Sequence, residues 1–154
     1  MYIGTQVAPR NNSDLEVRSQ LGVKNICADP FIEDEKGNFK SINPHDWTLD
    51  ILEKHIEIIE KNGLKLDMVQ IPLSSRPLEE SQSPNIMLGK SPERDIEIES
   101  IQKIIELCSK VRIPAVKYNM NIIGIPRSEN ENGRGGSINS VSYTHLTLPT
   151  NREV

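Results

Sequence analysis

The sequence predicts an α/β fold in which four strands alternate with three helices and lie parallel to one another. The strand segments are too apolar to face water on either side, which is typical of a parallel sheet covered by helices. The helix-to-strand connections are short, whereas the strand-to-helix connections are long and rich in Pro, Gly, Ser and Asn. The short connections are 20–24, 61–65 and 110–114, and the long ones are 30–47, 72–90 and 121 onward. In a (β/α) barrel, the strand-to-helix loops gather at the face that carries the chemistry.

The first expected strand covers residues 2–7. Ser13 and Glu16 have the spacing of a capping box, which opens a helix. Gly22 is suited to the left-handed turn that follows a last helical residue. Residues 24–29 then form the second expected strand.

The second helix is expected to begin at Thr48, a favourable N-cap, and to end at Gly63. Apolar residues recur within it at helical spacing, namely Leu49, Leu52, Ile56 and Ile59. Residues 65–71 are a compact apolar run closed by Pro72, and they form the third expected strand.

Ser91-Pro92-Glu93 predicts the start of the third helix, because it offers a cap, a proline at the first helical position and an acid in the first turn. Its expected buried stripe comprises Ile101, Ile104, Ile105, Cys108 and Val111. Residues 115–120 form the fourth expected strand.

Four strands are half of a TIM barrel, which needs roughly 250 residues in all. The chain is therefore either a partial barrel or a small open sheet. After residue 130 the composition turns to Asn, Gly, Ser and Arg, and residues 141–154 resemble a translated sequencing-adapter tail. A genuine β-type tail is the alternative. We expect residues 1–140 to be the N-terminal half of a (β/α)8 TIM barrel, with its first four strands and three helices, and residues 141–154 to be non-native.

Composition argues against several functional classes. The net charge of -4, with one Trp and two Phe, does not favour a nucleic-acid surface. No apolar run approaches the ~20 residues needed to cross a bilayer, and the N-terminus lacks the pattern of a signal peptide. The two cysteines, Cys27 and Cys108, do not suggest a disulfide framework. We expect a soluble, cytoplasmic protein that binds neither nucleic acid nor membrane.

Residues 66–75, 85–95 and 116–120 resemble the mannonate dehydratase branch of the xylose-isomerase-like TIM barrels, which includes sugar phosphate isomerase/epimerase-like members. The resemblance covers residues 1 to about 136. It implies a hydro-lyase of hexuronate breakdown that dehydrates D-mannonate to 2-dehydro-3-deoxy-D-gluconate with Mn²⁺ or Fe²⁺, and it allows a homo-oligomer when the protein is full length. The family's metal ligands lie in the second half of the barrel, so none is assigned here.

Two other functions stay open: a metal-dependent sugar (phosphate) isomerase or epimerase, and a non-catalytic half-barrel fragment. One fold hosts many reactions, so the fold does not separate them. Arg112 stands where relatives favour a turn glycine, which costs little if that turn stays right-handed.

Candidate substrate-binding residues lie at the ends of the expected strands. These are Gln6, Asp29, Gln70, Asn119 and Tyr118, with Arg127 following the last strand. Amide and carboxylate groups can match the hydroxyls of a sugar acid, and a planar guanidinium suits its carboxylate. The alternative for each polar residue at a strand end is a loop-capping hydrogen bond. Because side chains alternate, we expect Asn119 to point into the barrel and Tyr118 to point away.

Lys117 would share the inward side with Asn119 and needs a partner, for which we expect Asp67. If Asp67 points inward, Gln70 does not, unless a bulge intervenes. We favour the ion pair between Lys117 and Asp67 over an inward Gln70.

Other polar residues are expected to lie in contact with solvent. The remaining loop cations, Arg76, Lys90 and Arg94, are expected to be mainly solvated. His45 and His55 are expected at the surface, and residues 133–136 are expected to be a flexible segment.

Overall fold

The computed structural model describes residues 3–74, 76–120, 128–134 and 138–140. Its main sheet has the strand order β1-β2-β5-β6, and every neighbouring pair is parallel. The strands are β1 (Gly4–Thr5), β2 (Asn25–Cys27), β5 (Lys65–Gln70) and β6 (Ala115–Lys117). The helices α1 (Asn12–Gln20), α2 (Leu49–Lys61) and α4 (Glu93–Lys110) connect them. The predicted alternation of parallel strands and helices is confirmed, and a closed barrel stays a prediction.

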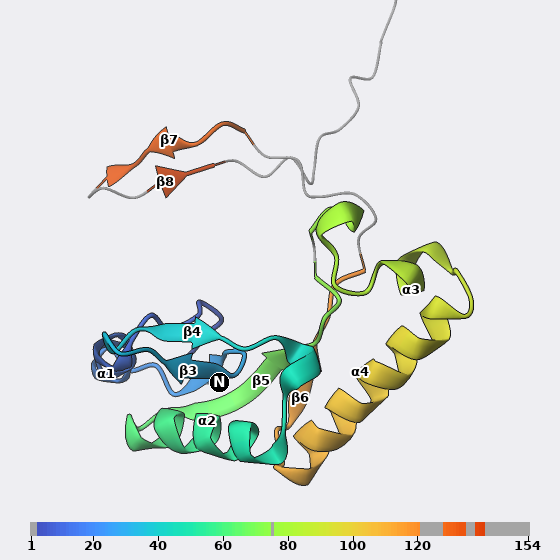
Figure 1. Ribbon diagram of the computed structural model, residues 1–154. Helices are drawn as coiled ribbons and strands as arrows, with labels where there is room; N and C mark the ends of the chain where they lie inside the picture. The colour runs from blue at the N-terminus through green and yellow to red at the C-terminus, as the bar shows by residue number, and fades with distance from the viewer. Residues whose placement is uncertain (1–2, 75, 121–127, 135–137, 141–154) are drawn as a thin grey trace, which may run out of the picture.

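One face of the sheet packs on helices and forms the core. Figure 1 shows α2 and α4 on this side of β5 and β6. Ile26 pairs with Leu66 and Val69 with Val116 across neighbouring strands. The core joins sheet residues to helix residues, including Leu15, Ile26, Leu52, Ile59, Leu66, Val69, Ile101, Ile104 and Cys108. Apolar burial of this kind stabilises by roughly 25 cal/mol per Å² removed from water.

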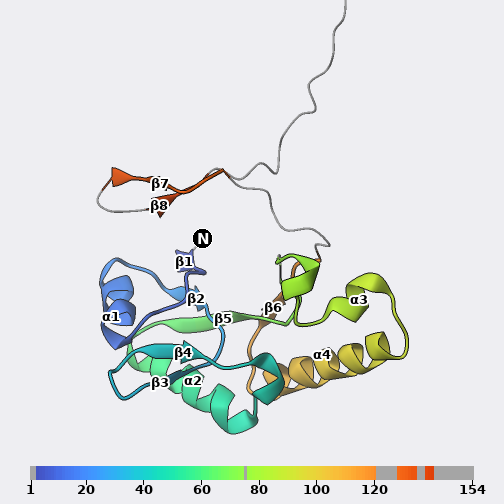
Figure 2. The same ribbon diagram turned by 45° about the horizontal axis from the view of Figure 1, so that its top comes forward.

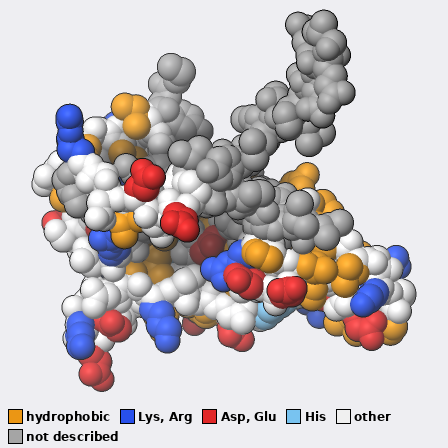
Figure 3. All heavy atoms as spheres, turned by 90° about the horizontal axis from the view of Figure 1, so that it is seen from above, with side chains coloured by type: hydrophobic (Ala, Val, Ile, Leu, Met, Phe, Trp, Pro, Cys, Tyr) orange, Lys and Arg blue, Asp and Glu red, His pale blue; other side chains and the backbone are white. Residues whose placement is uncertain are grey.

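The opposite face is polar, and we call it the open face. In the register, Asn25 lies beside Lys65, Cys27 beside Met68 and Gln70 beside Lys117. Because successive strand residues point to opposite faces, these pairs lie opposite the core. Figure 3 shows the molecule of Figure 1 from above. In this view, acidic and basic side chains lie next to one another around a hollow.

A bulge in β5 changes which residues reach the open face. Ile26 pairs with Leu66 and Cys27 with Met68, so Asp67 has no counterpart on β2. The extra residue resets the alternation. Asp67 lines a shallow hollow on the open face, and Gln70 lines a separate pocket. The predicted conflict between Asp67 and Gln70 therefore does not arise.

The long connections contain structure that the sequence patterns did not predict. The first holds an antiparallel hairpin of β3 (Phe31–Glu33) and β4 (Phe39–Ser41), followed by η1 (Pro44–Asp46). The rings of Phe31 and Phe39 stack across the hairpin with centroids 4.0 Å apart.

The other long connections are also partly ordered. The second holds η2 (Leu78–Glu80) and α3 (Pro84–Leu88). Where the sequence suggested no regular element, β7 (Glu131–Asn132) and β8 (Ile138–Asn139) pair antiparallel (Figure 2). Residues 141–154, the expected non-native tail, lie outside the described residues.

The helix starts agree with the sequence at only one of three positions. Thr48 caps α2 as predicted, because its hydroxyl accepts from the backbone N–H of Ile51 at 3.4 Å. At α1, Asn11 is the N-cap and accepts from Asp14 N at 2.9 Å, so Ser13 lies inside the helix. At α4, the residue before the helix is Pro92, and the Ser91 hydroxyl donates to the Asp95 carboxylate at 2.7 Å instead of capping.

The turns after the helices and the buried stripe of α4 agree with the sequence only in part. Gly22 and Gly63 take the predicted left-handed backbone, with φ of 84° and 72°. Arg112 also has a positive φ, of 61°, so the right-handed turn that would make an arginine there inexpensive is not formed. Ile105 is 43% exposed and lies off the buried stripe, whereas Cys108 is 2% exposed and belongs to the core.

Candidate ligand-binding site

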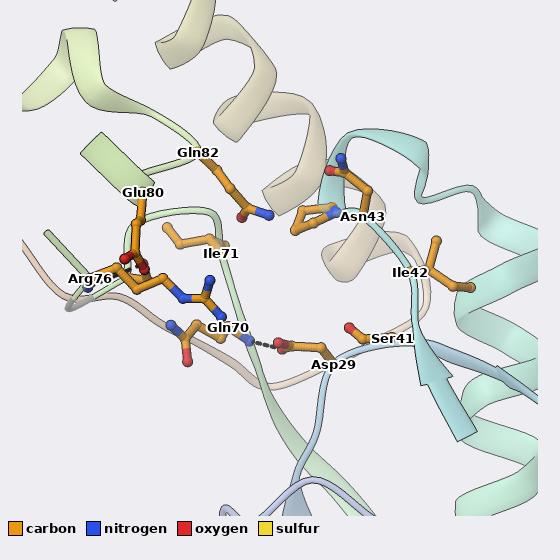
Figure 4. A pocket seen from close by; sticks show the side chains of 11 residues that line it. Asp29, Ser41, Ile42, Asn43, Gln70, Ile71, Arg76, Glu80 and Gln82 are labelled. Atoms are coloured by element: carbon orange, nitrogen blue, oxygen red, sulfur yellow. Dashed lines mark hydrogen bonds between the residues drawn. The ribbon is translucent and has the colours of Figure 1, made fainter. Parts of the chain in front are cut away.

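A pocket of about 560 Å³ opens where β2 and β5 end. Its wall combines the strand ends with two connections, the segment after the β3-β4 hairpin and the segment after β5 (Figure 4). The lining residues are Asp29, Ser41, Ile42, Asn43, Pro44, Gln70, Ile71, Ser74, Arg76, Glu80 and Gln82. This volume is in the range of small-molecule sites, and its position at the carboxyl ends of parallel strands is where α/β folds bind ligands.

Asp29 and Gln70 form the floor of the pocket. The backbone N–H of Gln70 donates to Asp29 Oδ1 at 2.7 Å, which joins the ends of the two strands (Figure 4). Burial raises the pKa of Asp29, and the Gln70 N–H and the positive charge of Lys117 oppose that rise. One carboxylate oxygen is thus fixed by the fold.

A buried histidine holds the residue before Asp29. His55 is 1% exposed, so the predicted surface position is wrong. Its Nε2 lies 3.0 Å from the carbonyl oxygen of Ala28, to which it donates, and its ring meets Phe31 edge-on at 4.6 Å. Burial lowers the pKa of His55 to about 4, so the imidazole is neutral near pH 7. His55 therefore positions the end of β2 and the hairpin together.

The first connection is fixed to the strands and to α4. The Trp47 indole donates to the carbonyl of Ile42 at 3.3 Å, and the N–H of Ile42 donates to Pro30 O at 2.9 Å. His45 Nδ1 lies 2.9 Å from the hydroxyl of Ser100 on α4. These bonds hold Ser41 and Asn43 at the pocket wall.

Arg76 is the cation among the described residues that line the pocket, and its side chain is exposed, as the sequence predicted. Figure 4 shows its guanidinium directed toward Gln70 and the floor. Among the residues that the structure describes, no carboxylate lies within 4.0 Å of it. A guanidinium that is not engaged by a carboxylate can donate hydrogen bonds to both oxygens of a ligand carboxylate. Arg94, another candidate cation, is instead paired with Asp95 at 2.7 Å.

The predicted site residues fall into three groups. Asp29 and Gln70 meet in the pocket. Gln6 lies on the open face, where its side-chain oxygen accepts from Lys117 at 3.0 Å. The predicted ion pair between Lys117 and Asp67 is wrong. The ion pairs of the described residues do not include it, and Lys117 donates to Gln6 instead.

The remaining predicted residues do not line this pocket. Tyr118 is 58% exposed. Asn119 is half-buried, and its backbone N–H donates to the carbonyl of Leu73 at 2.7 Å. Arg127 lies outside the described residues.

Sequence patterns missed most of the pocket wall. The polar residues not foreseen are Ser41, Asn43, Ser74, Glu80 and Gln82. All belong to the two long connections, whose length and polarity did indicate a site. Nothing local distinguishes these side chains from other polar loop residues.

A divalent metal does not fit the described part of the chain. Over residues 3–74, 76–120, 128–134 and 138–140, no three His, Cys, Asp or Glu side chains gather as a metal-binding group. In the same ranges, no helix has the length and apolar character to cross a bilayer.

Comparison with known proteins gives a likeness to a solved structure. No protein-family model matches the chain, and no curated protein matches it. The crystal structure of mannonate dehydratase from Streptococcus suis serotype 2 superposes with a TM-score of 0.63 at 20% identity, covering 91% of this chain. The two share a fold. The chain spans only 36% of that enzyme's length.

Proposed function

We propose that the chain forms the substrate-binding, N-terminal part of a mannonate dehydratase-like hydro-lyase, which dehydrates D-mannonate to 2-dehydro-3-deoxy-D-gluconate. The main support is the pocket at the strand ends, where Arg76 stands without an ion-pair partner among the described residues, next to Asp29 and Gln70. The fold that the chain shares with the Streptococcus suis enzyme adds to it.

The pocket chemistry suits an acyclic sugar acid. Arg76 can bind the carboxylate, which a bidentate guanidinium recognises better than a neutral group. Asn43, Gln82 and the serine hydroxyls can pair with sugar hydroxyls, and Asp29 has a second oxygen to accept from one. Asp29 and Gln70 are half-buried, so a ligand without a matching hydroxyl would leave them unpaired and bind less tightly.

Dehydration beside a carboxylate also requires polarisation of that carboxylate, a base and an acid. Mn²⁺ or Fe²⁺, together with residues beyond those described, would supply these groups. The described residues bind and orient the ligand. On this view the purified chain binds sugar acids and does not turn them over.

A titration of the purified chain by NMR tests the proposal. D-mannonate is compared with D-mannitol, which lacks the carboxylate, and with D-fructose 6-phosphate, which represents an isomerase ligand. We expect D-mannonate to shift the amide signal of Gln70, and D-mannitol to leave it unchanged. A response to the sugar phosphate in place of mannonate would support the isomerase alternative, and no response to any of them would support the non-catalytic fragment.

Arg76→Gln supplies the residue-level test. It should weaken mannonate binding about tenfold or more, the usual consequence of losing a hydrogen bond to a charged group. Arg94→Gln is the matched control, because that arginine already has a carboxylate partner. Equal effects of the two substitutions would contradict the assignment of the pocket.

A further inference from the structure

The main sheet has two outer strands, β1 and β6, and among the described residues neither has a further strand beside it. Figure 2 shows β1 and α1 toward one end of the molecule, and β6 and α4 toward the other. We call these regions the β1 end and the β6 end. An open strand edge is a place where another chain can add strands.

The backbone at both ends has hydrogen-bonding groups directed away from the sheet. The carbonyl of Lys117 and the N–H of Asn119 bond to the segment after β5 at 3.0 and 2.7 Å. In a parallel pair, alternate residues bond to the same neighbouring strand, so Val116 directs its N–H and C=O outward. On β1, the carbonyl of Ile3 accepts from Lys24 before β2 at 2.9 Å, and the next residue faces outward in the same way.

At the β1 end, α1 has apolar residues on the flank that faces away from α2. Asn12 of α1 accepts from Asn62, the residue after α2, at 2.9 Å, which fixes the side of α1 that faces α2. Val17 and Leu21 lie about 140–180° around the helix axis from Asn12, because each residue turns an α-helix by about 100°. Both side chains are exposed.

At the β6 end, α4 has the same feature. Ser100 lies 2.9 Å from His45 in η1, which precedes α2, so this side of α4 faces the first connection and α2. Ile98 and Ile105 lie about 140–160° around the axis from Ser100. Both are exposed.

Exposed apolar side chains also flank the edge strands themselves. Ile3 and Val7 lie on either side of β1, and Tyr118 and Met120 follow β6. With the two helix flanks, they make up most of the large apolar side chains that are exposed in the described residues. Apolar surface gathered in this way marks a site of protein contact.

The form of the β6 end specifies what can cover it. Its free edge accepts a strand parallel to β6, and the apolar flank of α4 requires a helix in the same layer as α4. The β1 end of another copy offers both. Its strand β1 runs parallel to the rest of the sheet, and α1 packs on the same core as α4 through Leu15.

We propose that a second copy of this chain docks on both ends at once, with the β1 end of each copy against the β6 end of the other. A two-fold axis along the strand direction keeps all the strands parallel and closes the pair. Two copies then bring together eight parallel strands, the number in a TIM barrel. Pairing one end with itself would leave the other end exposed. The proposal is independent of the sugar-acid function.

Closure would also enclose the open face. Cys27 is half-buried and lines the shallow hollow of that face with Asp67 and Met68. Its thiol therefore faces solvent through the hollow in a single chain and an enclosed interior in the pair. Cys108 lies in the core in either case.

Light scattering after size-exclusion chromatography tests the proposal on the purified chain. We expect twice the mass of one chain at micromolar concentration. Replacing both Ile98 and Ile105 by Glu should give single chains with unchanged circular dichroism. Ile96→Glu is the matched control, because Ile96 is an exposed isoleucine about 160° around α4 from Ile98, and it should leave the pair intact. A single-chain mass for the unsubstituted protein would overturn the proposal and point to a different polypeptide as the partner.

A second double variant tests which ends meet. Replacing both Val17 and Leu21 by Glu should also give single chains, because every seam needs one β1 end. The two variants keep opposite ends intact, so an equimolar mixture should form a mixed pair joined at one seam, which native mass spectrometry detects when one variant carries ¹⁵N. A mixture that stays as single chains would contradict the proposal. A variant of α1 that pairs with itself would contradict it too, since the β6 end would then bind its own copy.

Alkylation of Cys27 by N-ethylmaleimide tests the closure itself. The unsubstituted pair should react several-fold more slowly than the single-chain variant of α4, and Cys108 should stay unreactive in both. Equal rates at Cys27 would show that the copies meet without enclosing the open face, which would overturn the proposed arrangement.

Discussion

Glu97 on α4 holds Asn85 on α3. One oxygen of its carboxylate accepts from the Asn85 side-chain amide at 2.7 Å, and the other accepts from the backbone N–H of Ile86 at 2.9 Å. Both bonds fix the first turn of a short helix that follows the pocket residue Gln82. Residues 85–95, one of the segments on which the sequence resemblance is based, thus contain a structural contact.

Replacing Glu97 should loosen this connection. Glu97→Ala leaves the Asn85 amide and the Ile86 N–H without their acceptors, so we expect a loss of about 1–3 kcal/mol in the free energy of unfolding. Hydrogen exchange should accelerate in 84–88, and urea unfolding should report the global loss. Glu99→Ala, an exposed neighbour on the same helix, is the control. Equal exchange in the two variants would contradict the role of Glu97.

The stability of the protein should fall as pH drops from about 6.5 to about 4. The folded pKa of His55 is lowered to about 4 by burial, below its ordinary value of 6.5. The unfolded chain therefore binds a proton in this window that the folded chain does not, and protonation favours unfolding. The loss should approach about 3 kcal/mol, because each pKa unit corresponds to about 1.4 kcal/mol.

Chemical unfolding at several pH values measures this dependence. The raised pKa of Asp29 acts with the opposite sign, since its folded state binds the proton more readily, and it acts toward the lower end of the window. His55→Gln can keep a donor for Ala28 O and should remove the loss between pH 6.5 and 5. An identical pH dependence in that variant would refute the assignment to His55.

Arg112→Gly should stabilise the protein. Arg112 has φ of 61°, where residues other than glycine are strained. Relief of that strain should outweigh the extra freedom of glycine in the unfolded chain, with a net gain of about 0.5–1 kcal/mol. Gly63→Ala is the converse change, because φ is 72° there and the added Cβ would meet the Ser19 hydroxyl at 3.2 Å. Thermal unfolding should give a higher Tm for the first variant and a lower Tm for the second.

Asp67→Asn should be nearly neutral for folding. A charge pair with Lys117 would have made this substitution costly, but Lys117 contacts Gln6 and Asp67 lies at the bulge. We expect a change within about 0.5 kcal/mol. Asp14→Asn is the comparison, because Asp14 pairs with Arg18 at 2.8 Å and accepts from the Arg10 N–H at 3.0 Å. A larger loss for Asp67→Asn than for Asp14→Asn in urea would restore the pair with Lys117.

Local sequence patterns were sufficient for the order of the four parallel strands and of the three helices that connect them. Thr48, Gly22 and Gly63 act on the backbone within a few residues, and their signals could be recognised without knowing the fold. Asp29 and Gln70 could be proposed because the end of a strand is a local feature. The hairpin was missed because Phe31 and Phe39 support it by stacking on one another across a charged turn.

The sequence by itself determined the alternation of strands and helices, the helix periodicity and the end of the sheet at which the long connections gather. The tertiary structure decided the partners: Gln6 for Lys117, Ala28 for His55, and the pocket for Arg76. These contacts depend on how the strands lie side by side, on one extra residue at Asp67 and on the path of two long connections. The position of each contact depends on the backbone path over many residues. No short pattern of residue types predicts such a path.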